Sequence, residues 1–131
     1  MKKMIALLLA AMMVLSMAAC ASKTAAAADS DLAYIQDKGT LVIGITDFEP
    51  MDYKDADGSW IGFDADMAKA FAESLGVTAE FVEIDWDNKI LELDSKTIDC
   101  VWNGMTLTAE VTSTMECSNA YCNNAQVVIV P

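Results

Sequence analysis

The sequence predicts an α/β fold whose sheet contains parallel strands. Two observations carry this prediction. Segments rich in β-branched residues alternate with short amphipathic segments over about 90 residues, which is the pattern of strands joined by helices. Glycines follow two of the amphipathic segments where a helix is expected to end, at Gly39 and Gly76. No internal repeat of fixed period is found, and the length suits one modest domain.

Local signals place the expected elements along the chain. Helices are predicted where a capping residue precedes an apolar face, and strands where β-branched residues cluster. Asp64 is predicted to be the N-cap of a helix with Met67, Phe71 and Leu75 on one face, which neighbouring alanines widen. The expected order is a helix from Asp31 stopped by Gly39, a strand at 40–45, a return strand of a hairpin at 59–63, the helix after Asp64, a strand at 77–84, a helix opening at Asp85, a strand at 97–102, a short helix from Thr108 and a strand at 126–130.

The first 30 residues are expected to direct and anchor the protein rather than to fold. Two lysines precede an apolar run at 4–19, which has the length of a secretory signal and is short for a membrane span. The run ends on small residues before Cys20 and resembles the lipobox of bacterial lipoproteins, although Met17 stands where leucine is usual. This resemblance implies a signal peptide at 1–19, lipidation of Cys20 and a place on the outer face of the membrane. Ordinary cleavage, with Cys20 incidental, is the alternative. Residues 20–30 are expected to be a flexible tether.

Composition excludes several classes of function. The chain has 20 acidic against 8 basic residues, a formal net charge of −12, and neither arginine nor histidine. Nucleic-acid binding is not expected, because it needs a basic face. Histidine bases and histidine metal ligands are excluded, and we expect neither a metal site nor a cofactor. Cys100 is expected to pack as a small apolar residue, while Cys117 and Cys122 could form a disulfide in an oxidising exterior.

Four stretches then resemble one family in their order, spacing and content. They are GTLVIGITDFEPMDY, DGSWIGFDADMAKAFAESLG, EIDWDNKILELDSKTID, and NGMTLTAE followed by CSNAY. Together, residues 39–131 resemble the extracellular solute-binding proteins of amino-acid ABC importers. The resemblance implies a periplasmic-binding-protein type II-like fold, with residues 31–131 as an incomplete first lobe truncated before the second. It also implies a monomer that captures a small polar solute, most simply an amino acid, and delivers it to a cognate ABC permease without catalysis.

The same resemblance implies the residues that contact the ligand. The loop after the first strand supplies a polar group and an aromatic ring, and the helix start after Ile84 supplies a stacking ring. The NGMTLT stretch supplies carbonyls, amides and hydroxyls; Gly104 would let the backbone approach the ligand, and a helix beginning at Thr108 would point free N–H groups at an anion. The expected ligand-binding residues are Asp47, Phe48, Trp86, Asn103, Gly104, Met105, Thr106 and Thr108.

One departure from the family pattern concerns the ligand's carboxylate. Many members have an arginine three residues after the second threonine of this stretch, where this chain has Val111 and no arginine elsewhere. A lysine cannot form the two parallel hydrogen bonds that an arginine donates to a carboxylate. Either helix-start amides and hydroxyls alone hold the carboxylate, or the ligand is not a standard α-amino acid. The acidic residues near the expected site form a solvated rim or, if they line it, favour a cationic or zwitterionic ligand; they are Asp47, Glu49, Asp85 and Asp87.

Other interpretations stay open at this level. Phe48 and Trp86 could be core aromatics, as expected for Trp60 and Trp102. A periplasmic dehydratase on the same fold is the alternative from the enzyme class, since a fold does not imply a function. An acidic surface lipoprotein that binds another protein is the third alternative.

Overall fold

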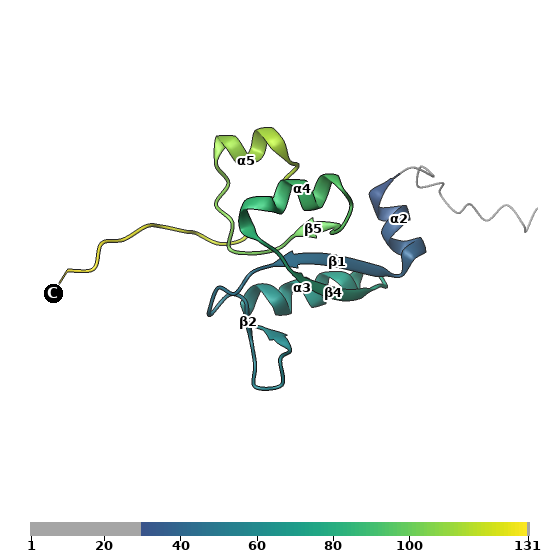
Figure 1. Ribbon diagram of the computed structural model, residues 1–131, viewed down its shortest axis with the longest axis horizontal. Helices are drawn as coiled ribbons and strands as arrows, with labels where there is room; N and C mark the ends of the chain where they lie inside the picture. Colours follow the sequence, from purple (N-terminus) through teal and green to yellow (C-terminus); the bar gives the residue numbers. More distant parts are fainter. Residues whose placement is uncertain (1–29, 131) are drawn as a thin grey trace, which may run out of the picture. The chain divides into compact units, whose positions relative to one another are not determined.

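The computed structural model describes residues 30–130, and the compact unit that carries the sheet begins at Ile35. The expected signal peptide, Cys20 and the tether up to residue 29 lie outside the described residues. No helix within the described range is long and apolar enough to cross a membrane. The elements, shown in Figure 1, are α2 (Asp31–Lys38), β1 (Thr40–Ile45), β2 (Tyr53–Lys54), β3 (Trp60–Ile61), α3 (Phe63–Ser74), β4 (Thr78–Glu83), η2 (Trp86–Asn88), α4 (Lys89–Asp94), β5 (Cys100–Val101) and α5 (Ala109–Thr114).

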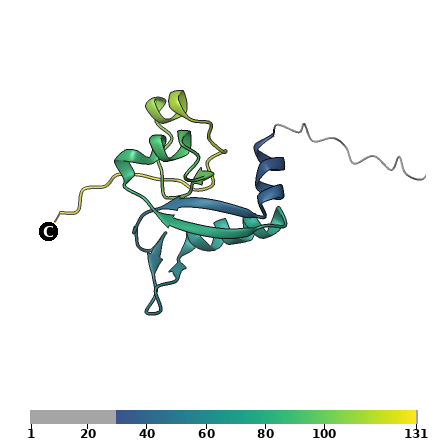
Figure 2. The same ribbon diagram turned by 45° about the vertical axis from the view of Figure 1, so that its right-hand side comes forward.

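The main sheet has three parallel strands in the order β4-β1-β5. Thr40 lies opposite Thr78 at one end of the β1–β4 pair and Ile45 opposite Glu83 at the other, and Figure 2 shows the two strands side by side. β5 is shorter and pairs with the second half of β1, with Ile43 opposite Cys100. Strands that alternate with helices and run parallel confirm the α/β prediction.

Side chains that alternate along β1 form the core. Leu41 and Ile43 are buried in one cluster with Ala68 and Ala72 of α3, and Ile45 is buried in a second cluster. Because alanine is small, the α3 backbone can lie close to the sheet. The predicted face of α3 is therefore correct in its alanines, whereas Met67 and Leu75 are half-buried and Phe71 is 45% exposed. An alanine-lined helix packs closely and leaves long side chains at its flanks.

The opposite side of β1 packs against isoleucines from the flanking segments. A Cβ placed on Gly44 would lie 2.6 Å from Ile98 Cδ1 and 3.1 Å from Ile84 Cδ1, so a larger residue would require these side chains to shift. Figures 1 and 2 show α3 and α4 on opposite sides of the β1–β4 pair. Two side chains expected in the interior are there: Trp60 is buried and Trp102 packs on the core. Cys100 also packs on the core, where burial raises the pKa of its thiol to about 12.

Helix α3 begins differently from the prediction. Its N-cap is Gly62, not Asp64, and no side chain caps it. The Asp64 amide donates instead to the Met51 carbonyl at 2.9 Å, so the backbone of the preceding loop supplies the missing partner. The sequence favoured aspartate because its carboxylate is a good cap. In the fold this carboxylate points inward and accepts a 2.8 Å hydrogen bond from Tyr121 Oη.

A second buried carboxyl group lies in the same region. Asp52 is fully buried, and neither of its oxygens has a hydrogen-bond partner among the described residues. The pKa of Asp52 is raised to about 7, mainly by burial and also by the nearby charge of Asp64, while the Ala65 amide acts in the opposite direction. Burial also raises the pKa of Asp64, while the hydrogen bond from Tyr121 acts in the opposite direction. No pattern in the sequence predicts this pair.

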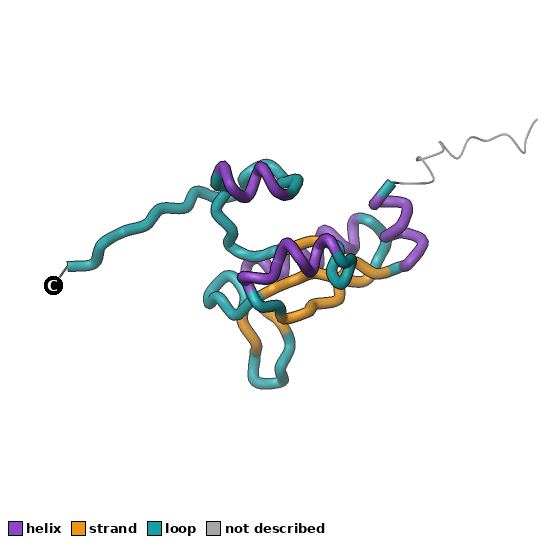
Figure 3. The backbone as a smooth tube through the Cα atoms, turned by 45° about the horizontal axis from the view of Figure 1, so that its top comes forward, coloured by secondary structure: helices purple, strands orange, loops and turns teal. Residues whose placement is uncertain are grey.

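Several other boundaries differ from the prediction. The predicted hairpin exists as β2 and β3, but residue 63 already belongs to α3. Residues 97–102 contain only the two-residue strand β5. Residues 126–130 were predicted as a strand and form none; Figure 3 draws the chain after α5 as loop. A β-branched run becomes a strand only where it pairs, and here it is exposed. Cys117 and Cys122 are free thiols, so the disulfide considered above is not formed.

Candidate ligand-binding groove

The carboxyl ends of the three parallel strands bring distant segments together at one edge of the sheet. β1 leads to Thr46, β4 leads to Trp86 through Asp85, and β5 leads to Asn103. Ligands of open α/β sheets bind at this edge. A groove of about 440 Å³ lies there, lined by Thr46, Phe48, Trp86, Lys89, Asn103, Gly104, Met105, Thr106, Thr108 and Val111.

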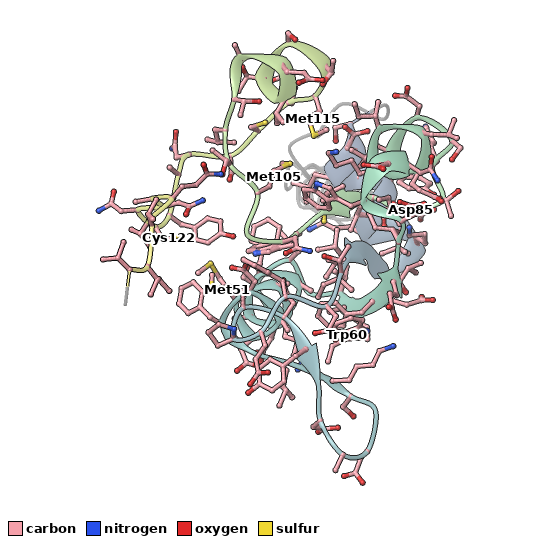
Figure 4. All side chains as sticks on the ribbon, turned by 60° about the vertical axis from the view of Figure 1, so that its left-hand side comes forward. Met51, Trp60, Asp85, Met105, Met115 and Cys122 are labelled. Carbon is pink, nitrogen blue, oxygen red and sulfur yellow. The ribbon has the colours of Figure 1, made fainter. Side chains whose placement is uncertain are left out.

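The groove contains seven of the eight residues expected to bind the ligand. The exception is Asp47, which is exposed and does not line it. Three lining residues were not among the eight: Thr46, Lys89 and Val111. Val111 had been noted only as a departure from the family pattern. Figure 4 labels Met105, which lines the groove, and Asp85, on the segment that leads into η2.

Asn103 joins two of the converging segments. Its side chain is 8% exposed; its amide nitrogen donates to Thr46 Oγ1 and its amide oxygen accepts from the Gly104 N–H at 2.8 Å. Both ends of the amide are therefore used within the protein. We interpret Asn103 as a residue that holds the segments after β1 and β5 together, and the groove polar groups as the hydroxyls and backbone around it.

Trp86 is placed by a capped turn. Asp85 caps η2 by accepting from the Asp87 N–H at 3.0 Å, and the Trp86 ring is partly buried. Lys89, one turn further on, donates from Nζ to the Trp86 carbonyl at 3.1 Å and lies 4.6 Å from the centre of the Trp86 ring. The carbonyl bond and the cation–π contact together hold the ammonium beside the indole.

The short helix α5 offers less to an anion than the sequence suggested. It has six residues, and its N-cap Thr108 uses its hydroxyl oxygen to accept from the Val111 N–H at 3.3 Å. The Val111 amide is therefore not free for a ligand. The Thr106 hydroxyl also has a partner, Asn124 Nδ2, at 3.0 Å. A helix this short also carries a small dipole, and the expected anion site at its start stays a prediction.

Glycine at position 104 leaves room for a neighbouring ring. A Cβ there would lie 2.8 Å from Phe48 Cε1 and 3.2 Å from Phe48 Cδ1. The absent side chain thus makes room for the Phe48 ring, and the expected approach of a ligand to this backbone stays a prediction. Phe48 is still half exposed and lines the groove, so it is not a core aromatic.

The charge of the groove also differs from one expectation. None of the four acidic residues considered at its rim lines it, and Asp85 is occupied as a cap. Among the lining residues, Lys89 alone carries a formal charge. The groove is therefore neutral to weakly cationic, in a chain whose net charge is −12.

Comparison with known proteins accounts for this arrangement. Residues 41–131 match the bacterial extracellular solute-binding proteins, family 3. The arginine-binding extracellular protein ArtP of Bacillus subtilis is 32% identical over 130 residues, which are 98% of this chain and 48% of ArtP. Cyclohexadienyl dehydratase of Pseudomonas aeruginosa is 33% identical over 95 residues, which are 72% of this chain and 35% of the enzyme.

A solved structure supports the fold. The arginine-bound form of domain 1 from TmArgBP is 38% identical, with a TM-score of 0.58 over 61% of this chain and 64% of that domain. The fold is thus a partial α/β domain of the type II periplasmic-binding-protein kind, as expected for a first lobe. This chain spans about half the length of ArtP and less of the dehydratase. The match over most of the chain answers the question of family: the chain belongs to family 3 of the bacterial extracellular solute-binding proteins.

Proposed function

We propose that the chain forms the first-lobe half of the ligand site of an ABC importer's substrate-binding protein. In this proposal it binds a small polar solute, most simply an L-amino acid, outside the membrane, acts as a monomer and delivers the solute to a cognate permease. The observation that carries the proposal is the meeting of seven motif residues, from three separate strand ends, in one groove. A relative's domain 1, crystallised in an arginine-bound form, supports ligand binding by one lobe.

Stacking on Trp86 is expected to contribute to that binding. We expect Trp86→Ala to weaken binding of the best amino acid roughly tenfold or more, because a stacked aromatic ring supplies both contact area and a polarised face. The measurement is a thermal-shift screen of the full chain against each L-amino acid at millimolar concentration, followed by calorimetry on the strongest. A ligand that binds only the folded state raises the midpoint of unfolding.

Two variants serve as controls for this experiment. Trp86→Phe keeps a ring and should retain most of the affinity. Phe63→Ala removes a half-exposed ring outside the groove and should leave affinity unchanged. If no L-amino acid stabilises the wild-type chain, the amino-acid assignment is wrong; if Trp86→Ala binds as tightly as the wild type, Trp86 does not stack on the ligand.

A dehydratase remains the second candidate, because one relative bears that name. The groove argues for binding without catalysis. Its lining contains no carboxylate, and Lys89 is the one lining side chain with an ordinary acid–base function. Incubation of the ligand found in the screen with the chain, followed by mass spectrometry, distinguishes the two functions: an enzyme converts its ligand, whereas a binding protein returns it unchanged.

We also propose that the protein is anchored outside the membrane through Cys20. The family is extracellular, and the small residues before Cys20 follow a secretory apolar run. Acylation of Cys20 predicts that cells grown with labelled palmitate incorporate the label into the wild-type protein and not into Cys20→Ser. Cys122→Ser removes an exposed thiol and should keep the label. Equal labelling of Cys20→Ser would show that the anchor lies elsewhere, and an unlabelled wild type would favour ordinary cleavage.

A further inference from the structure

The groove has no obvious partner for a carboxylate. The chain contains no arginine, and Val111, at the family's arginine position, lines the groove with an apolar side chain. The polar side chains near Val111 carry no charge: the Thr108 hydroxyl accepts from the Val111 amide, and both ends of the Asn103 amide are used within the protein. A buried anion needs charge-assisted donors to offset its lost hydration.

Lys89 is the lining residue that can supply such donors. It is the first residue of α4 and partly buried. One of its three N–H groups bonds to the Trp86 carbonyl, and the ammonium lies 4.6 Å from the Trp86 ring centre. These contacts fix the position of the charge but leave two donors for another acceptor.

Three other lysines of the described residues have acidic partners. Lys38 pairs with Asp99, Lys54 with Glu83 and Lys69 with Asp66. Within residues 30–130, Lys89 makes no ion pair of this kind, although the chain has a large excess of carboxylates. A partly buried ammonium that faces a groove and lacks a counter-ion is a site for an anionic group of a ligand.

We propose that Lys89 binds the ligand's carboxylate and replaces the arginine that this chain lacks. The proposal rests on the proposed function, since it names the residue that recognises the amino acid's carboxylate. The binding is by a point charge and not by a planar fork, so it selects for negative charge more than for carboxylate geometry. The lining offers no acidic side chain for a second cation. The groove as described therefore favours neutral or acidic amino acids over the arginine named for ArtP.

The test compares an acid with its uncharged amide on three proteins. The L-amino acid that stabilises the wild-type chain most, and its α-carboxamide, are titrated calorimetrically at about pH 6, where α-amines stay protonated. The proteins are the wild type, Lys89→Met and Lys54→Met, the last removing a lysine of the hairpin outside the groove. Lys89→Met should weaken binding of the acid roughly 10- to 100-fold and change that of the amide little. Lys54→Met should bind both as the wild type does.

A further variant separates charge from folding. Lys89→Arg keeps a cation and should restore most of the preference for the acid, and circular dichroism shows whether each variant is folded. If Lys89→Met is folded and still prefers the acid as strongly as the wild type, the proposal is wrong while the binding function stands. If no L-amino acid binds the wild-type chain, the binding function itself is wrong, and the role of Lys89 with it.

Discussion

Replacing Gly62 by alanine is expected to destabilise the fold by about 3–5 kcal/mol, which is a large part of the stability of a small domain. Gly62 has φ 114° and ψ 175°, a conformation that residues with a Cβ rarely adopt. The new Cβ would also overlap the Met51 carbonyl oxygen and lie 2.8 Å from that of Pro50. Both obstacles are backbone atoms, so no side-chain rotation can relieve the contact.

The effect extends beyond one contact because these carbonyls cap α3. The Asp64 N–H donates to Met51 O at 2.9 Å and the Phe63 N–H to Pro50 O at 3.4 Å. Pushing the loop away breaks both bonds, each worth about 1 kcal/mol. The same loop continues back to Phe48, whose N–H bonds to Asp52 O at 2.6 Å. We therefore expect a Gly62→Ala chain that still folds to lose ligand affinity as well.

Urea unfolding measures this effect, with Gly58→Ala as the matched control. Gly58 also has positive φ, 80°, but nothing lies within 4 Å of its added Cβ. Its substitution should cost only the backbone strain, about 1–2 kcal/mol. The difference between the two variants measures the clash with the loop together with the greater backbone strain at Gly62. Equal costs would mean that the loop moves freely away from α3 and does not cap it.

The regular elements could be predicted because local sequence determines them. Strand β1 begins and ends where predicted, since a β-branched run follows Gly39 and ends before a polar loop. Gly76, with φ 76°, ends α3 as expected of a glycine just after a helix. The parallel direction of the strands also follows, because short helices between strands lead to parallel pairing.

The N-cap of α3 shows where local reasoning fails. Aspartate is the better cap by its own chemistry, yet the backbone amide of Asp64 itself is bonded to a loop carbonyl 13 residues earlier, which places the residue inside the first turn. The Asp64 carboxylate bonds instead to Tyr121, 57 residues later in the chain. Neither partner can be found without the tertiary structure. The strand predicted at 126–130 was wrong for a related reason: propensity favours extended backbone but supplies no neighbouring strand.

The lining residues of the groove were predicted more completely than its charge. Trp86 and the NGMTLT stretch were recognised by motif, and the parallel sheet brings them together. Lys89 was not recognised, because a lysine near aspartates at the start of a helix is usually solvated. Its place in the groove depends on a side-chain contact with the Trp86 carbonyl that no spacing rule describes.

The buried carboxyl pair leads to the second large effect, which depends on pH. Burial raises the pKa of Asp52 from 3.8 to about 7. Between about pH 4 and 7 the folded state therefore holds a proton that the unfolded state has released, so stability falls as pH rises through this range and is level above it. Each pKa unit corresponds to about 1.4 kcal/mol. Because of Asp52, the free energy of unfolding of the wild-type chain should thus be about 2–3 kcal/mol lower at pH 8 than at pH 5.

Asp52→Asn removes the titrating group and keeps its shape. The amide cannot ionise, and it offers an N–H group in a region where Asp64 has an oxygen with no partner among the described residues. We expect the variant to match the wild type near pH 5 and to be about 2–3 kcal/mol more stable at pH 8. Most other carboxylates contribute equally to both proteins, so the difference between their urea-unfolding free energies at each pH reports on Asp52.

An exposed aspartate provides the comparison. Asp57, in the hairpin turn, is exposed, and no hydrogen bond of its carboxylate is found within the described range. The unfolding free energies of Asp57→Asn and of the wild type should differ by the same amount at every pH from 5 to 8. If the difference in unfolding free energy between Asp52→Asn and the wild type is also constant with pH, Asp52 ionises normally in the folded protein, and the loop that carries it opens to water. If the difference grows with pH as expected, the carboxyl group that the fold buries opposes folding at neutral pH, as functional positions often do. The growing difference would then identify the buried site formed by Asp52, Asp64 and Tyr121 as a part of this lobe that lowers its stability at neutral pH.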